Sequence, residues 1–403
     1  MDSLTQIVLG AAVGEAALGK RVGNSAMIWG AIAGTIPDMD VLSNLFMSPI
    51  DALAFHRGIS HSIAFNILLA FLMGWLVSEL YKQSWHRYIG VVFWNVLGLC
   101  LIGFLIYTLG ADFRPIFFAV LFMGLWSYLV YKRYFRDSYE TPVAPLKGWI
   151  WLFVLALVTH PVLDCFTNYG TQIWLPFSDN RVAFNNISVV DPLYTIPFII
   201  CLLMAASLNR THDSRRFWNF AGISISSFYM IFTIVNKVRV NTIFENSLAI
   251  ENIQYERFMT TPTLLNNVLW YGIAETRDGY VYGTYSFLDK DKVFKLQKRP
   301  KDFLSLGDTL QNDNTLKTLQ WFSNGYFNLK PVNDTLYEYT DLRFGSMTFD
   351  DTKERDIFRF SLRRNNYGTF ELLKDRQRPE MNPGKAFSAL WSRILGRSNQ
   401  KPL

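Results

Sequence analysis

The sequence predicts a polytopic α-helical membrane protein with a soluble, β-rich C-terminal domain of the α+β kind. Half of the 403 residues are apolar and 16% are aromatic. Six apolar segments are each about as long as the roughly 20 residues that a helix needs to cross a bilayer. After Lys237 the chain becomes charged, Asn-rich and aromatic. The six segments are residues 62–81, 88–109, 112–131, 149–168, 190–209 and 217–236.

Two shorter apolar segments precede these six. Residues 4–18 and 24–36 are rich in Gly and Ala but are short for complete spans. The opening MDSLTQ carries an acid and no basic residue, so we expect a retained helix rather than a cleaved signal peptide.

Basic residues gather in every second connection between the apolar segments. Short loops rich in Lys and Arg stay in the cytoplasm. If both short N-terminal segments cross the membrane, residues 36–60, 169–190 and everything after 237 lie on the outer face of the inner membrane. The net charge of +6 then reflects loops near lipid, and no nucleic-acid partner is expected. The basic residues are Lys20, Arg21, Lys82, Arg87, Lys132, Arg133, Arg136, Lys147, Arg210, Arg215 and Arg216.

We therefore expect two domains, a helical membrane domain over 1–236 and an extracytoplasmic domain over 237–403. In the second, GIAETRDGYVYGTYSFL, LQWFSNGYFNLK and FRFSLRRNNYGTFELL each read as a hairpin. Residues 298–318 look helical or irregular. The basic tail from Ala386 forms either a short amphipathic helix at the lipid surface or a frayed end.

The stretch FHRGISHS places His56, Arg57 and His61 just before a long apolar segment. The two histidines are five residues apart, about 140° on an ideal helix, so one helical face cannot hold both. We expect a loop that delivers His56, a bend at Gly58, and a helix that Ser60 caps and His61 begins.

Acids and a third histidine lie on the same predicted face. Asp38 and Asp40 follow Pro37, which ends a Gly/Ala helix. His160 and Asp164 are four residues apart and therefore stack on one helix surface. Asp191 begins the next apolar segment.

This convergence predicts a metal site, because imidazole nitrogens and carboxylate oxygens are ligands for Zn²⁺ and similar ions. We expect one to three divalent ions, with Zn²⁺ the leading candidate. Taken singly, Asp38 and Asp40 also fit a cap at a hairpin, and His160 with Asp164 fits a hydrogen-bonded helix pair. Gln6 and Glu15 are possible further members of the site.

The same motifs resemble the YdjM-like membrane-bound proteins, a family of predicted metal-dependent hydrolases. The resemblance covers roughly residues 1–200 and rests on MDSLTQ, IPDMD, HRGISHS, THPVLD, FTNYGTQIWLPF and VVDPLY. Many members carry a His where this chain has Gln6. The resemblance implies metal roles for Asp38, Asp40, His56, His61, His160 and Asp164. An Asp, a His and an HxxxD pair are also distantly similar to the zinc-dependent phospholipase C group.

The favoured function is a metal-dependent hydrolase that acts on an ester or phosphoester, lipid-derived ones included, at the outer face of the membrane. Asp38 and His61 are the candidates to orient the attacking water, and Arg57 the candidate to bind anionic substrate. The bilayer and a small-molecule or lipid substrate are the expected partners. The alternative is a non-catalytic transporter or lipid-binding scaffold with a structural metal.

Overall fold

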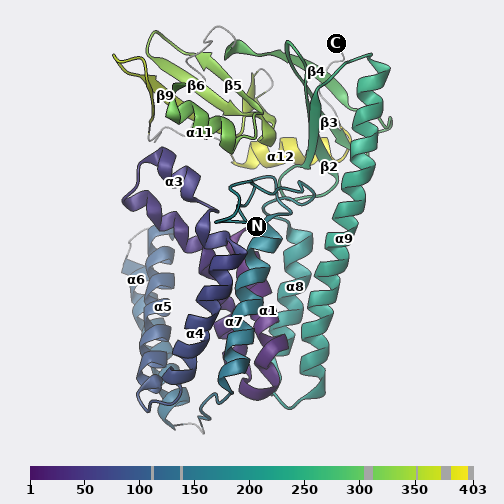
Figure 1. Cartoon of the computed structure of the whole chain (residues 1–403). Coiled ribbons are helices and arrows are strands. Elements are labelled where there is room, and N and C mark those ends of the chain that lie inside the picture. The colour runs from purple at the N-terminus through teal and green to yellow at the C-terminus, as the bar shows by residue number, and fades with distance from the viewer. Residues whose placement is uncertain (110–112, 137–138, 304–311, 351–352, 374–382, 398–403) are drawn as a thin grey trace.

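The computed structural model describes residues 1–109, 113–136, 139–303, 312–350, 353–373 and 383–397. A bundle of long helices carries a β-rich domain at one end, as expected from the sequence (Figure 1). Four of the described helices are long and apolar enough to cross a membrane. They are α4 (Ile63–Leu80), α5 (His86–Leu109), α7 (Leu146–Asp164) and α9 (Asp213–Ile250).

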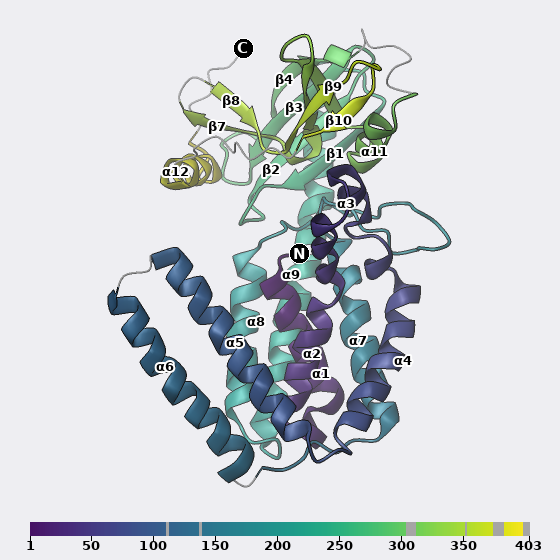
Figure 2. The same cartoon turned by 90° about the vertical axis from the view of Figure 1, so that its left-hand side faces the viewer.

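The remaining helices complete the bundle and its upper rim. α8 (Pro192–Ser207) is apolar but shorter than the four long helices. α5 and α6 form a hairpin that stands to one side of the other helices (Figure 2). The others are α1 (Ser3–Val22), α2 (Asn24–Thr35), η1 (Pro37–Leu45), α3 (Pro49–Phe55), η2 (Ile59–His61), α6 (Phe113–Tyr131) and the π-helical η3 (Lys132–Arg136).

Helices α1 and α2 touch through their backbones. A methyl group added at Gly10 would overlap the carbonyl oxygen of Gly30, and one at Gly14 would overlap that of Ala26. Small residues four apart allow this close approach between helices in membranes. The glycines that the sequence places in the first two segments therefore act in helix packing.

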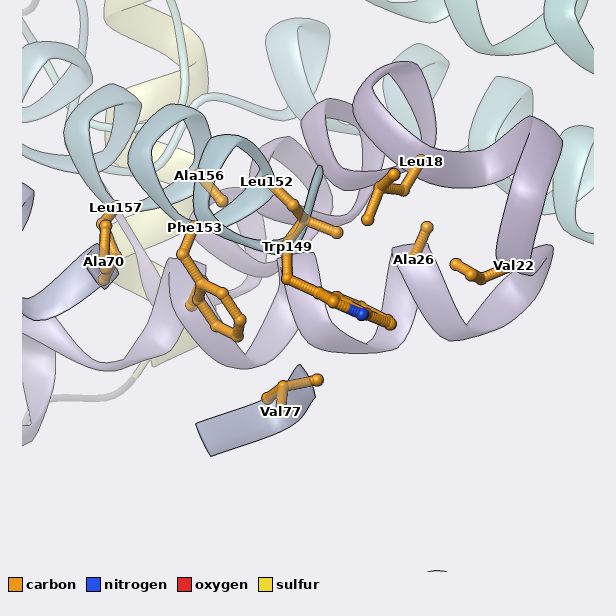
Figure 3. Packing of buried hydrophobic residues seen from close by; sticks show 11 residues of the cluster. Leu18, Val22, Ala26, Ala70, Val77, Trp149, Leu152, Phe153, Ala156 and Leu157 are labelled. Carbon is orange, nitrogen blue, oxygen red and sulfur yellow. The ribbon is translucent and has the colours of Figure 1, made fainter. Parts of the chain in front are cut away.

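Helix α7 lies at the centre of the membrane domain. Trp149, Phe153 and Leu157 are buried between α1, α2 and α4 (Figure 3). Ala70 and Val77 of α4 complete this core. α7 is thereby held on several sides, which fixes the position of the HxxxD pair at its upper end.

Helix α9 joins the two halves of the chain. Its 38 residues run without interruption from Asp213 to Ile250 and rise beside the β-rich domain (Figure 1). Phe244 and Leu248, near its upper end, pack with Trp270 and Val281 of the first sheet. Residue 236, the expected end of the membrane domain, falls inside this helix.

The C-terminal half contains antiparallel sheets. One has the order β1-β2-β3-β4, a second the order β10-β9-β6-β5, and β7 pairs with β8. The strands are β1 (Arg257–Pro262), β2 (Leu269–Glu275), β3 (Gly279–Ser286), β4 (Lys295–Pro300), β5 (Phe327–Pro331), β6 (Leu336–Asp341), β7 (Ser346–Asp350), β8 (Lys353–Asp356), β9 (Arg359–Arg364) and β10 (Phe370–Leu372), with α11 (Asn314–Phe322), η5 (Leu342–Phe344) and α12 (Pro383–Ile394).

Two of the three expected hairpins are present, β2–β3 and β9–β10. The hairpin expected for LQWFSNGYFNLK is wrong, because LQWF belongs to α11. Asp313 caps that helix, and Leu316, Leu319 and Phe322 bury one of its faces. Asn324 and Gly325 have positive φ and end the helix rather than turn a hairpin.

Residues 298–318 were expected to be helical or irregular. Strand β4 extends into this segment as far as Pro300, α11 begins in it at Asn314, and residues 304–311 lie outside the described part. The tail is helical from Pro383 to Ile394, and residues 398–403 also lie outside it.

Candidate metal centre

Four side chains from three elements meet where the helical bundle faces the β-rich domain. Pro37 starts η1 directly after α2 and places Asp38 there, η2 supplies His61, and the last turn of α7 supplies His160 and Asp164. One ligand atom from each residue lies within 4.8 Å of all the others. Such a group can hold a metal ion.

The nitrogen–oxygen separations inside this group are short and similar. Nε2 of His61 lies 3.5 Å from Oδ1 of Asp38 and 3.3 Å from Oδ2 of Asp164. Nε2 of His160 lies 3.5 and 3.6 Å from the same two atoms. The two Nε2 atoms are 3.2 Å apart. All four side chains therefore face one common point.

Both imidazole rings are held by their other nitrogen. Nδ1 of His160 is 2.7 Å from the carbonyl oxygen of Gly34, which can only accept, so Nδ1 carries the proton. Nδ1 of His61 lies 3.0 Å from the Ser60 hydroxyl and 3.3 Å from Oδ2 of Asp40. Partners of this kind orient metal-binding histidines and fix their tautomer. In the neutral rings both Nε2 atoms are then acceptors directed at each other, an arrangement that a cation between them satisfies.

Unsatisfied oxygens point to the same need. Oδ2 of Asp164 is fully buried and accepts no hydrogen bond within the described part of the chain. Its other oxygen accepts from the Gln6 side chain at 2.9 Å and contacts the amino group of Met1. Oε1 of Gln6 is also buried and has no partner among the described residues. Buried oxygens without donors are costly, and a bound cation removes that cost.

The pKa values of the groups in η1 and η2 follow from these contacts. Burial raises the pKa of Asp38, but hydrogen bonds with His160 and His61 outweigh it and hold the pKa below the usual range. Burial also raises the pKa of Asp40, but hydrogen bonds with His56 and His61 outweigh it and hold the pKa below the usual range. Burial lowers the pKa of His61, whereas Asp164, Asp38 and Asp40 together raise it to about 9. The site therefore favours positive charge, which a proton or a metal ion supplies.

Asp40 and His56 lie beside this group rather than in it. Asp40 accepts hydrogen bonds from the backbone N–H of Arg57 at 3.0 Å and from the Ser60 hydroxyl at 2.8 Å. Oδ1 of Asp40 lies 2.7 Å from Nδ1 of His56. With His61 on Oδ2, both carboxylate oxygens already face donors. Asp40 thus links the two histidines of HRGISHS.

Arg57 places a cation next to the centre. Its backbone has φ +58°, and its side chain is 5% exposed. Nε lies 3.3 Å from Oδ2 of Asp164, and Nη1 donates to the Thr167 hydroxyl at 3.0 Å. The guanidinium is therefore fixed beside the only carboxylate oxygen of Asp164 that faces the cluster.

The local backbone at this motif differs from the sequence prediction. Ser60 does not cap a helix but donates to Asp40, and His61 ends η2 instead of starting α4. Ser62 is the cap, since its hydroxyl accepts from the N–H of Phe65 at 3.1 Å. Gly58 lies so close to the carbonyl oxygen of Phe55 that a methyl group would sit 2.7 Å from it, which explains why a glycine is needed there.

The structure does not bring Glu15 or Asp191 into the four-residue group. Glu15 forms a buried ion pair with Arg215 of α9, with Oε1 and Nε 2.6 Å apart. Asp191 caps α8 through the N–H of Leu193 at 3.1 Å and accepts from the Tyr229 hydroxyl at 3.0 Å. Both acids have complete structural roles elsewhere in the bundle.

Sequence reasoning missed two neighbours of the centre. The Thr167 hydroxyl accepts a hydrogen bond from Arg57. The ring of Tyr169 lies 4.8 Å from the guanidinium carbon of Arg57 and 5.2 Å from the ring of His56. The signal was the segment FTNYG, which directly follows Asp164 on the predicted outer side.

A family model described as YdjM inner membrane protein matches residues 1–240. That range contains the whole candidate metal centre, the helices α4, α5 and α7, and α9 as far as residue 240. No curated protein sequence and no solved structure matches the chain. The family match covers more than half of the sequence, and the chain belongs to the YdjM inner membrane protein family.

Proposed function

We propose that this protein is a membrane-bound, metal-dependent hydrolase that cleaves an ester or phosphoester at the outer face of the inner membrane. The observation that carries the proposal is the group Asp38, His61, His160 and Asp164, whose ligand atoms face one point. The support given to both imidazoles by Asp40 and Gly34 adds to it.

The spacing is compatible with zinc. Four ligands at 2.0–2.1 Å from a tetrahedral Zn²⁺ ion stand about 3.3–3.4 Å from one another. The five separations given above run from 3.2 to 3.6 Å. Two nitrogens with two carboxylate oxygens also form a donor set that zinc accepts.

A divalent ion in this site would supply Lewis acidity and, with water as a fifth ligand or in the place of Asp38, a water molecule of lowered pKa. The side chain of Asp38 is 18% exposed, whereas those of the other three ligands are buried. Asp38 thus faces the approach to the site and is placed to orient the attacking water. Arg57 is placed to bind negative charge on the substrate, as its planar guanidinium suits phosphate and carboxylate oxygens.

The test of this function is turnover linked to metal. The purified full-length protein in detergent should hold close to one zinc ion per chain and should hydrolyse model carboxylic esters or phosphoesters. Chelation should abolish hydrolysis, and added Zn²⁺ should restore it. Stoichiometric metal without hydrolysis of any ester or phosphoester would instead favour the transporter or scaffold.

The location of the centre on the outer side rests on the loop charges. The basic connections that hold Lys20, Lys82 and Arg210 lie at the end of the bundle opposite the β-rich domain (Figure 1). With Cys100 replaced by Ser, we expect Lys290→Cys to react with an impermeant thiol reagent in intact cells. Lys82→Cys, also exposed, should react only after the cells are opened. The reverse pattern would place the centre in the cytoplasm.

A further inference from the structure

Tyr169 connects the metal centre to the C-terminal domain. The guanidinium carbons of Arg57 and Arg181 lie 4.8 and 5.2 Å from the centre of its ring. The ring of Phe322, in α11, meets it edge-on at 5.2 Å. One tyrosine is therefore shared by the arginine beside the metal centre, a second arginine and the β-rich domain above.

Two of the three arginines in this region have carboxylate partners. Arg57 lies beside Asp164, as described above. Arg343 forms two contacts with Asp341, Nε to Oδ1 at 3.0 Å and Nη2 to Oδ2 at 2.7 Å. Among the residues that the structure describes, no carboxylate lies within ion-pair distance of Arg181. Its guanidinium therefore adds one uncompensated positive charge.

The hydrogen bonds of Arg181 are incomplete as well. Nη2 donates to the carbonyl oxygens of Gly170 at 2.9 Å and Tyr169 at 3.4 Å. Nε and Nη1 are buried and have no acceptor in the described part of the chain. Donors left in this state cost free energy unless a ligand or water pairs with them.

Aromatic rings form the walls around this guanidinium. Its central carbon is 5.0 Å from the ring of Trp321 and 5.1 Å from that of Phe322, besides Tyr169. Burial lowers the pKa of Arg181 to about 10, to which the charges of Arg343 and Arg57 contribute. The surroundings thus hold the side chain in place without neutralising it.

We infer that Arg181 binds an anionic group of the substrate, of the phosphate type, next to the bond that is cleaved at the metal centre. The inference rests on the proposed hydrolase function. The free N–H groups on Nε and Nη1 can each donate to an oxygen of a phosphate. Tyr169 spaces this group from Arg57, so that one arginine serves the reacting group and the other a neighbouring anion.

The phosphate group can belong to a lipid or to a water-soluble molecule. The loop that carries Arg181 exposes Trp174 (54%) and Phe177 (86%), and Leu45 and Phe46 are exposed at the end of η1. Aromatic residues are enriched where a membrane meets water. These side chains favour a lipid phosphate, and the test separates the two sources.

The test measures anion binding by the full-length metal-loaded protein in phosphatidylcholine nanodiscs. Two probes are used, inorganic phosphate in solution and phosphatidic acid mixed into the disc. At least one should raise the melting temperature in a concentration-dependent way. Arg181→Gln should weaken that apparent affinity by about 10- to 100-fold, with unchanged metal content. Arg216→Gln is the control, because Arg216 also lies on an aromatic ring, that of Phe220, at the opposite end of the bundle.

The results separate the possible outcomes. Stabilisation by phosphatidic acid alone assigns a lipid phosphate, and stabilisation by inorganic phosphate assigns a soluble one. If neither probe stabilises the wild type, or if Arg181→Gln binds as tightly, the inference is wrong. Should Arg181→Gln not fold, Arg181→Lys keeps the charge without the planar fork and should bind with intermediate affinity; wild-type affinity there would also overturn it. None of these readouts needs turnover, so a failed hydrolysis assay leaves them interpretable.

Discussion

Replacing His160 or Asp164 by alanine removes most of the bound metal. Each supplies one of four ligand atoms that stand 3.2–3.6 Å from their neighbours, and three remaining ligands leave the site open. The loss of affinity should exceed the roughly 10- to 100-fold that follows from removal of a supporting residue. Metal content of the purified variants, measured by elemental analysis, checks this. His212→Ala, an exposed histidine, is the matched control.

The residues around the ligands give graded expectations for the same measurement. Asp40→Ala should weaken metal affinity by about 10- to 100-fold, because Asp40 orients His61 without joining the four ligands. His56→Ala should have a smaller effect still, since His56 contacts Asp40 alone among the acids. If His56→Ala removes as much metal as His160→Ala, the centre includes His56 as a ligand. Full metal content in both His160→Ala and Asp164→Ala would end the metal-site interpretation.

Replacing Gly30 by valine separates α1 from α2. Its new side chain would overlap the carbonyl oxygen of Gly10, and backbone cannot move aside as a flexible side chain can. Overpacking of this kind costs about 1–3 kcal/mol or more. The melting temperature in detergent should fall, and metal content should fall with it, because α2 leads directly to the Gly34 carbonyl and Asp38.

Gly124→Val is the control for that substitution. Gly124 also lies within an apolar helix, but outside that helix's own backbone no atom of the described residues lies within 4 Å of the position where its methyl group would be. We expect wild-type melting temperature and metal content. An equal loss of stability in both variants would show that valine harms any helix of this protein, irrespective of the α1–α2 contact.

The architecture was predictable from the sequence because the apolar segments that form the long helices are about 20 residues each and stand out from the charged C-terminal half. All four members of the site were among the predicted metal residues, and for two of them the relative position was predictable as well, since HxxxD fixes two side chains on one helical surface whatever the rest of the chain does. The pairing of Glu15 with Arg215 could not be predicted from the sequence, because only the fold brings together residues so far apart in the chain. An acid in an apolar helix looks the same in either role.

Local geometry was the second limit. Asn324-Gly325 ends a helix and Asp278-Gly279 turns a hairpin, although both dipeptides favour positive φ. What separates them is the face that Leu316, Leu319 and Phe322 bury, which requires the partner sheet to be known. The left-handed backbone at Arg57 had no signal at all, because arginine has no preference for that region.

The unbroken course of α9 limits how this protein can vary in length. A helix of 38 residues is about 57 Å long, while the hydrocarbon core of a bilayer is roughly 30 Å thick. Its upper part is thus a continuous helical extension that sets both the height and the rotation of the β-rich domain relative to the membrane domain. One residue inserted between Lys237 and Phe244 would lift that domain by about 1.5 Å and turn it by about 100°. Phe322 would then move away from Tyr169 and Trp321 from Arg181, so this stretch tolerates changes of side chain far more readily than changes of length.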